Sequence, residues 1–259
     1  GNLYVCGGFA PMGASVLCYN PMKTKPWTPM PNLKHSRNGC AALAVGRHLY
    51  VLGGQDGSEV LDSAERLDPG SKGEGFELVL PGMCQRRHAH AAVVIQRRIY
   101  ITGGCNKPRS EDMDSKVPRS AEVLSPGTGA GAPLPDMIVP RYSHSATVVE
   151  DTVVVSGGGI PGSKQSLNSV EVYAPLVGHW VLCPQMEMPE TRGAHLSLVA
   201  AGKLYVIGGS LEDTPSCPAQ RSMRCLDAEA LKWEKSPPMR LPRMCCCGTV
   251  LKFGPGALE

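Results

Sequence analysis

The segment Leu49-Tyr50-Val51-Leu52-Gly53-Gly54 decides the fold, because an apolar strand-like run that ends in two glycines occurs five times in this chain. The other copies end at Gly7-Gly8, Gly103-Gly104, Gly157-Gly158 and Gly208-Gly209. The first glycines of successive pairs are 46, 50, 54 and 51 residues apart. A period of about 50 residues is typical of a four-stranded propeller blade that packs against its neighbours around a central axis.

An arginine keeps a fixed distance from these glycines. It stands 16 residues before the first glycine in four repeats, at Arg37, Arg87, Arg141 and Arg192. A fifth arginine, Arg243, stands 16 residues before Gly7 if the count runs to Lys252 and then continues at Gly1. The spacing therefore predicts that Met244–Lys252 pairs beside Asn2–Cys6 and closes the ring. The alternative is a further blade outside this stretch of chain.

Side-chain size also repeats. A first strand of small residues, such as Ala89–Val94, suits the crowded axis, and large aromatic residues on the outer strand fill the wide end of each wedge. The aromatic residues of the outer strands are Trp27, Phe76, Trp180 and Trp233. This register of arginine, paired glycines and aromatic resembles the kelch repeat over almost the whole chain. The resemblance implies an all-β, five-bladed kelch β-propeller, although six blades are more usual in that family.

We expect one domain over residues 1–259. Its blades span about 32–81, 82–135, 136–187, 188–239, and 240–259 joined with 1–31. Because the repeat arginines recur at a fixed step, we expect them to hold neighbouring blades together by hydrogen bonds to carbonyls or carboxylates.

Composition excludes several classes of protein. The net charge of +3 lacks the concentrated basic stripe of a nucleic-acid binder, and no apolar run reaches the roughly 18 residues of a membrane span. Eleven cysteines, an odd number without a zinc spacing, indicate reduced thiols in the cytoplasm or the nucleus. No signal peptide is visible, and a first residue other than Met indicates a piece of a longer protein.

One column of residues has metal-ligand chemistry. The residues three positions after each arginine are Cys40, His90, His144, His195 and Cys246. Strand alternation puts them on one face, toward the channel or a neighbouring blade, and such side chains bind zinc or copper. Residues spread around a propeller axis are too far apart to share one ion, so a structural role is favoured. We predict no metal and no cofactor.

Two further motifs are candidates for a reactive thiol and for a nucleotide site. Cys84, beside Arg86 and Arg87, is a candidate activated thiol, because neighbouring cations lower a thiol pKa; an ordinary loop cysteine is the favoured alternative. The pattern from Gly127 to Ala132 lacks the strand-and-helix context of a nucleotide site. No recognisable catalytic set is present, so we expect that the protein is not an enzyme.

The resemblance implies function as well. Kelch propellers most often bind proteins, and the favoured hypothesis is the substrate-recognition domain of a BTB–kelch adaptor for a cullin-type ubiquitin ligase. Cullin contact would then use domains that this chain lacks. A cytoskeletal or scaffolding kelch protein that binds actin or another structural partner is the alternative. A kelch-fold enzyme or metal protein, such as the copper oxidases, is a third.

In that family the ligand face is built by the loops that enter the first strands and the loops that follow the paired glycines. The loops that enter the first strands hold eight basic residues and three acidic ones, which predicts an acidic protein or peptide ligand; an ordinary solvated rim is the alternative. The predicted partner-binding residues are Lys34, Arg37, Arg86, Arg87, Arg109, Arg141, Lys164, Arg192, Arg240 and Arg243.

Overall fold

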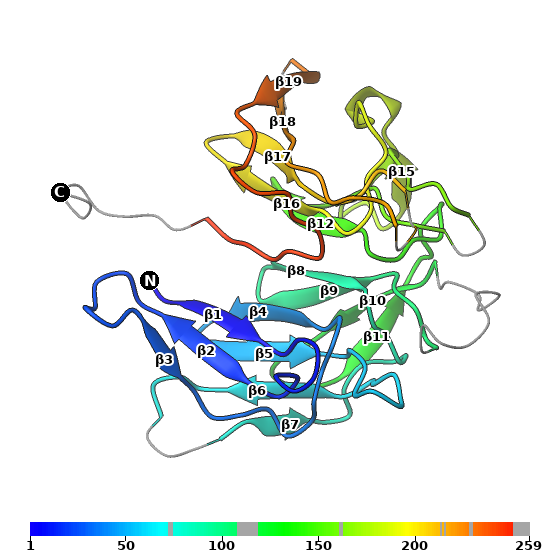
Figure 1. Ribbon diagram of the computed structural model, residues 1–259. Helices are drawn as coiled ribbons and strands as arrows, with labels where there is room; N and C mark the ends of the chain where they lie inside the picture. The colour runs from blue at the N-terminus through cyan, green and yellow to red at the C-terminus, as the bar shows by residue number, and fades with distance from the viewer. Residues whose placement is uncertain are drawn as a thin grey trace.

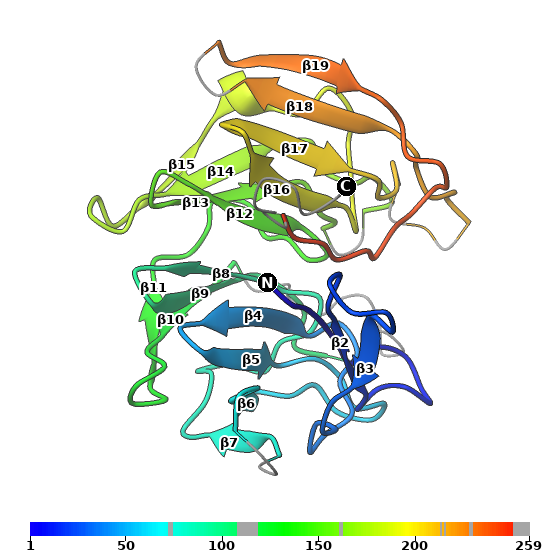
Figure 2. The ribbon, with the colours of Figure 1, turned by 90° about the vertical axis from the view of Figure 1, so that its left-hand side faces the viewer.

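The computed structural model is an all-β propeller of five blades (Figure 1). It describes residues 1–71, 75–107, 119–160, 163–212, 214, 216–227 and 230–250. Within these ranges the strands form five separate antiparallel sheets, and in each sheet the strands follow one another in chain order. The views in Figures 1 and 2 agree that β1–β11 form one half of the molecule and β12–β19 the other half.

Four of the sheets have four strands. The bounds are β4 (Ala41–Val45), β5 (His48–Leu52), β6 (Ala64–Leu67) and β7 (Glu77–Val79) in one, and β8 (Ala91–Ile95), β9 (Arg98–Thr102), β10 (Ala121–Leu124) and β11 (Gly131–Leu134) in the next. The others hold β12 (Ser145–Val149), β13 (Thr152–Ser156), β14 (Val170–Tyr173) and β15 (Trp180–Leu182), then β16 (Leu196–Ala200), β17 (Lys203–Ile207), β18 (Met223–Asp227) and β19 (Lys232–Ser236). Each sheet lies inside one of the expected blade ranges.

The remaining sheet has only three strands, β1 (Leu3–Cys6), β2 (Val16–Tyr19) and β3 (Trp27–Pro29). The predicted pairing of Met244–Lys252 with Asn2–Cys6 is therefore wrong over 244–250, which form no strand. Residues 251–259 lie outside the described ranges. The five blades are confirmed, but the strand that should close the ring is not formed in the described part of the chain.

An inner ring of backbone hydrogen bonds joins the blades near the axis. The residue two positions after each arginine donates its N–H to the same residue of the preceding blade: Ala89 to Gly39, Ser143 to Ala89, Ala194 to Ser143 and Cys245 to Ala194, at 2.7–2.8 Å. All five have φ between +49° and +64°. No bond between these described residues leads from Gly39 back to Cys245, so the ring is open at one junction.

A buried arginine clamp holds each complete blade together. Arg37 is fully buried; its Nη1 donates to the Gly53 carbonyl at 2.7 Å, and its Nε and Nη2 donate to Glu65 Oε1 at 3.1 and 3.0 Å. Its Nη2 also donates to Ser63 Oγ at 2.7 Å. One side chain thus ties the end of the second strand to the third. Arg87 and Arg141 repeat the arrangement with Glu122 and Glu171.

These arginine side chains act within a blade, which corrects the expectation that they join neighbouring blades. Their main-chain carbonyls make the link between blades instead. The second glycine of each pair donates to the carbonyl of the next repeat arginine at 2.7–3.0 Å. The pairs are Gly8 to Arg37, Gly54 to Arg87, Gly104 to Arg141, Gly158 to Arg192 and Gly209 to Arg243.

The last complete blade has the same clamp with its charges exchanged. Arg224 stands where the other blades have glutamate, and the carboxylate comes from Glu190 instead. Glu190 Oε2 lies 3.0 Å from Arg192 Nη2 and 3.1 Å from Arg224 Nε. The hydrogen bonds from Arg224, together with the charge of Arg192, lower the pKa of Glu190. The carboxylate therefore stays ionised where it serves two guanidinium groups.

The incomplete blade has no clamp. At the position of the clamp glutamate it carries Leu17, and Arg243 is exposed. A guanidinium that is buried without a carboxylate partner is strongly unfavourable. The sequence keeps the step of 16 residues at Arg243. Arg243 nevertheless does not bind into the blade, because its carboxylate partner is missing.

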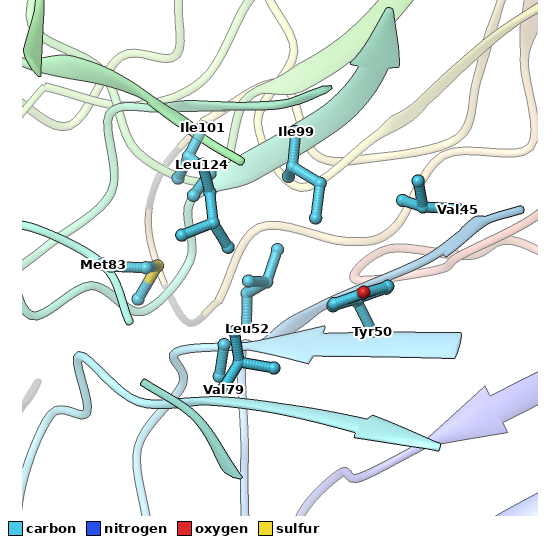
Figure 3. Close-up of a cluster of buried hydrophobic side chains, with 9 residues drawn as sticks. Val45, Tyr50, Leu52, Val79, Met83, Ile99, Ile101 and Leu124 are labelled. Carbon is cyan, nitrogen blue, oxygen red and sulfur yellow. The ribbon is translucent and has the colours of Figure 1, made fainter. Parts of the chain in front are cut away.

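Apolar side chains from facing sheets fill the space between blades. Figure 3 shows Leu52 and Tyr50 of β5 packed with Ile99 and Ile101 of β9 and Leu124 of β10. The methyl groups of Met83, Met137, Met188 and Met239 would each lie within 3.1 Å of a Cβ placed on the first glycine of the preceding blade. The main-chain carbonyl oxygen of the next repeat arginine would lie closer still, at 2.3–2.5 Å, and φ is positive at all four positions, so they favour glycine. In the described part of the chain, no helix is long and apolar enough to cross a membrane.

The clamp makes a prediction about stability. Replacing Glu171 by Ala leaves the buried Arg141 guanidinium without its carboxylate, and we expect a loss of about 3–5 kcal/mol in the free energy of unfolding. Urea titration followed by tryptophan fluorescence measures the loss. Arg243→Ala is the matched control, because that arginine is exposed, and we expect it to change the free energy by less than about 0.5 kcal/mol. Equal effects of the two substitutions would contradict the clamp.

Candidate functional site

The two loop sets that were expected to build a ligand face lie side by side at one end of the sheets. Isolated antiparallel bridges join a residue just after each repeat arginine to a residue just after each glycine pair: Asn38 to Gln55, His88 to Cys105, Tyr142 to Gly159 and Gly193 to Ser210. We call this end of the propeller the glycine-pair face. In each of these blades the bridge sets the loop before the first strand beside the loop after the second strand.

The buried clamps position the loops of this face. Glu65 accepts hydrogen bonds from the main-chain N–H groups of Lys34 and His35, at 2.7 and 3.1 Å. Glu171 accepts from Ile138 and Val139 in the same way, at 2.6 and 3.0 Å. One carboxylate therefore neutralises the arginine of its blade and also holds the loop that leads into that blade. The loop conformation depends on a group in the core.

Four of the predicted partner-binding residues are not on the surface. Arg37, Arg87, Arg141 and Arg192 are at most 1% exposed. They present no charge to a ligand, and including them in the rim was wrong, because their guanidinium groups belong to the clamps. The cationic excess counted from the sequence shrinks accordingly.

The other predicted residues differ in whether their charge is already paired with an acidic neighbour. Lys34, Lys164, Arg240 and Arg243 are exposed. Arg86 is exposed too, but its guanidinium lies 3.3 Å from Glu59 and 3.8 Å from Asp62, two acidic residues of the adjacent loop. Arg109 lies outside the described residues. Among the described candidates, Lys34 and Arg240 therefore carry the hypothesis of an acidic ligand better than Arg86.

Exposed apolar side chains on the same face were missed at the sequence level. Phe9 is 73% exposed and Met12 54% exposed in the loop after Gly8, and Leu241 is 62% exposed in the loop that precedes Arg243. The available signal was the presence of large apolar residues in the loops that were expected to form the rim. Such side chains supply the apolar anchors that protein interfaces use.

The cysteine and histidine column turns toward the neighbouring blade. His144 Nε2 lies 2.9 Å from Thr102 Oγ1, and His195 Nε2 lies 2.9 Å from Ser156 Oγ, in each case across a blade junction. His90 faces Gly53 at the same position. No group of three or more histidine, cysteine, aspartate or glutamate side chains is placed to hold a metal ion within the described ranges. The column packs the blades together.

Burial changes the protonation of these histidines. It lowers the pKa of His90 and of His195 from 6.5 to about 3, with the adjacent Arg87 and Arg192 adding to the effect. The pKa of His144 lies well below 6.5 for the same reasons, with Arg141 beside it. All three are neutral in the folded protein near neutral pH.

The surroundings of Cys84 are opposite to those that an activated thiol needs, which favours the ordinary loop cysteine. Burial and the Glu122 carboxylate raise the pKa of Cys84, and they outweigh the lowering by Arg87. The clamp explains this outcome, because Arg87 is already neutralised by Glu122 at 2.8 Å. No disulfide joins any of the eleven cysteines, all of which lie in described ranges.

A hollow of about 610 Å³ lies away from the glycine-pair face. It is lined by Tyr4 of β1, by the turn between β4 and β5, and by residues 68–71 after β6. The ion pair of Arg47 with Asp68, at 2.8 Å, joins two of its lining residues. The hollow shares none of the loops that carry the candidate partner-binding residues.

Comparison with known proteins gives concordant matches. The family described as "KLHDC2/KLHL20/DRC7 Kelch-repeats domain" matches residues 84–252, and the "Kelch motif" matches residues 36–72. Kelch-like protein 23 of Mus musculus is 26% identical over 266 residues, which cover 98% of this chain and 42% of that protein. Kelch-like protein 33 of Homo sapiens is 32% identical over 60% of this chain and 28% of that protein. The chain thus spans less than half the length of these relatives.

The solved structures give a match to the fold. The "Structure of YjhT" superimposes with a TM-score of 0.78 and 13% sequence identity, over 94% of this chain and 82% of that chain. At this identity the likeness is evidence for the propeller architecture alone.

The histidine column predicts how stability depends on pH. In the unfolded chain a histidine binds its proton near pH 6.5, whereas the folded protein resists protonation down to about pH 3 at His90 and His195. Folding stability is therefore complete above pH 6.5 and falls as the pH is lowered, by about 1.4 kcal/mol per pH unit for each histidine. Urea titrations between pH 7 and pH 4.5 measure the slope.

The matched variants are His144→Gln and His179→Gln. The first removes one buried histidine, so the slope should fall by about one proton, or about 1.4 kcal/mol per pH unit. The second removes an exposed histidine and should leave the slope unchanged. A slope that His144→Gln does not alter would mean that this ring is protonated in the folded protein.

Proposed function

Because the chain belongs to the kelch-repeat family, we propose that its propeller is the substrate-recognition domain of a larger ubiquitin-ligase adaptor. Kelch propellers are protein-binding domains, and the glycine-pair face is the surface we assign to the partner. Contact with a cullin would be made by parts of the protein outside this chain. Chemistry on the bound partner would also be done elsewhere, so the propeller itself is not an enzyme.

The observation that carries the proposal is the construction of the glycine-pair face. Its loops are fixed by hydrogen bonds to buried carboxylates, as at Glu65 and Glu171. A surface whose backbone is already ordered loses less conformational entropy when a partner binds. The same surface exposes apolar side chains at Phe9 and Leu241. Ordered loops with apolar anchors suit the recognition of a protein or peptide.

The charge of the face supports a partner with acidic residues. Lys34 and Arg240 are exposed in loops that lead into first strands, whereas Arg86 lies beside Glu59 and Asp62. An acidic segment would meet positive potential at the first two positions and a locally balanced surface at the third. Long-range attraction of this kind increases the rate of association and weakens with added salt.

We place the protein in the cytoplasm or the nucleus, where eleven thiols would remain reduced. Substrate adaptors of ubiquitin ligases work in these compartments. Partner capture from cytosolic and nuclear extracts with the intact protein, followed by mass spectrometry, identifies candidates. Enrichment of actin or other filament proteins in place of ligase components would favour the cytoskeletal alternative.

The charge of the face gives a direct test. Reversal of Lys34 and Arg240 together to Glu should weaken binding of the captured partner about tenfold or more, which corresponds to about 1.4 kcal/mol. The loss should come mainly from slower association and should shrink in high salt. Biolayer interferometry at two salt concentrations measures both effects, with thermal stability as a check on folding.

The matched control is Arg97→Glu, an exposed arginine in the turn between β8 and β9 at the opposite end of the sheets. We expect this variant to bind as the unaltered protein does. Unchanged affinity in the Lys34 and Arg240 double variant, or a comparable loss in Arg97→Glu, would place the partner elsewhere and overturn the assignment of the face.

A further inference from the structure

The junction between the two ends of the chain is the weakest place in the ring. The inner edge of β1 has no partner strand in the described part of the chain, whereas the second strand of every other blade pairs on both sides. Leu17 takes the place of the clamp glutamate, and Arg243 remains exposed. The inner ring of backbone hydrogen bonds also stops at Cys245. We call this junction the seam.

The four complete blades share one register between their first and second strands. The residue four positions after the repeat arginine lies opposite the residue before the glycine pair. The pairs are Ala41 with Leu52, Ala91 with Thr102, Ser145 with Ser156, and Leu196 with Ile207. Applied to the seam, the same register sets Cys247 opposite Cys6. Among these five pairs of opposite residues, only the pair in the blade without a clamp has cysteine at both positions.

The C-terminal run already lies in the right place for this pairing. In both Figure 1 and Figure 2 the red segment passes between the β16 sheet and the half of the molecule that contains β1. Cys247 is exposed there, and Cys6 is half-buried in β1. Burial raises the pKa of Cys6 to about 12, and the thiols of Cys40 and Cys247 add to this effect. Cys6 therefore has two candidate partners, Cys40 and Cys247.

We propose that Cys6 and Cys247 form an oxidative modification site, a disulfide that pairs the C-terminal run with β1 and closes the propeller ring. Directly opposite residues of antiparallel strands have Cα atoms about 4.5–5.5 Å apart, which is within the range that a disulfide spans. In the reduced protein, which is the state we expect under ordinary conditions in the cytoplasm or the nucleus, the seam stays open as described above. In the oxidised protein a covalent bond takes over the role of the missing clamp.

The oxidant that we assign is a low-molecular-weight disulfide such as oxidised glutathione. The exposed Cys247 thiolate attacks one sulfur of the reagent, which forms a mixed disulfide and releases one glutathione thiolate. Cys6, whose raised pKa makes this the slower step, then gives up its proton, attacks the Cys247 sulfur and displaces the second glutathione. Two protein thiols lose two protons and two electrons, and one glutathione disulfide becomes two glutathione thiols.

Cys40 is the competing partner, and its position argues against it. Cys40 and Cys6 occupy the places of His144 and Thr102, which meet across a blade junction at 2.9 Å only because the histidine side chain is long. The sulfur of a cysteine is two bonds closer to Cβ than Nε2 of a histidine. The Cys40 sulfur instead lies 3.9 Å from the Cys6 carbonyl and 3.8 Å from the Arg37 carbonyl. Its sulfur thus lies against main-chain carbonyl oxygens, whereas the strand register places Cys247, and not Cys40, directly opposite Cys6.

The test uses the full-length protein with and without oxidised glutathione. Peptide mapping without reduction should find a cross-link between the peptide that contains Cys6 and the peptide 244–252, and fragment ions should assign it to Cys247. The melting temperature should rise by about 5 °C or more on oxidation, because the bond joins distant parts of the chain. Reduction should reverse both changes.

Three variants make the result decisive. Cys40→Ser and the double variant Cys245→Ser with Cys246→Ser should keep the cross-link and the rise in melting temperature. Cys247→Ser should lose both. A cross-link that excludes Cys6 or Cys247, a rise that persists in Cys247→Ser, or oxidation to mixed disulfides alone would overturn the proposal.

Discussion

The buried arginine clamp is the interaction on which the rest of this propeller depends. A fully buried guanidinium is tolerated only when carboxylate and carbonyl acceptors surround it. Arg37 meets that requirement with the Gly53 carbonyl, Ser63 and Glu65, which belong to the second and third strands of one blade. The same carboxylate orders the loop at Lys34 and His35. Blade integrity and the shape of the candidate partner-binding face therefore share one cause.

The exchange of charges at Glu190 and Arg224 shows that the buried guanidinium needs a carboxylate beside it, but that this carboxylate need not come from a fixed position in the repeat. What recurs is a carboxylate within reach of the buried guanidinium, and the chain supplies it from the loop before Arg192 when the third strand carries arginine. Where no carboxylate is available, beside Leu17, the arginine stays exposed and the blade lacks its inner strand. The presence or absence of one acidic group separates the closed junctions from the open seam.

Much of this fold can be predicted from the sequence because its signals are periodic. The glycine pairs and the arginines at Arg37, Arg87, Arg141 and Arg192 identify five blades, since both must recur wherever strands approach the axis. The closing strand was predicted wrongly because the prediction used only the spacing of Arg243 and not the carboxylate that a buried arginine needs. Each clamp glutamate of a third strand stands two residues after a serine, as Glu65 does after Ser63. The matching serine of the first blade, Ser15, is followed two residues later by Leu17, and this difference identifies the blade without a clamp. The charge of the face was overcounted because four of the five repeat arginines are buried in clamps.

The buried clamp carboxylates hold the loops of the glycine-pair face. The most direct measurement is native-state hydrogen exchange by NMR in Glu171→Gln, in which an amide group replaces one of the two acceptor oxygens used by Ile138 and Val139. We expect protection at Ile138, Val139 or both to fall about tenfold or more, which corresponds to the loss of one charge-assisted hydrogen bond. Lys34 and His35, which are held by Glu65 in another blade, should keep their protection. Unchanged exchange at Ile138 and Val139, or an equal loss in both loops, would contradict the claim.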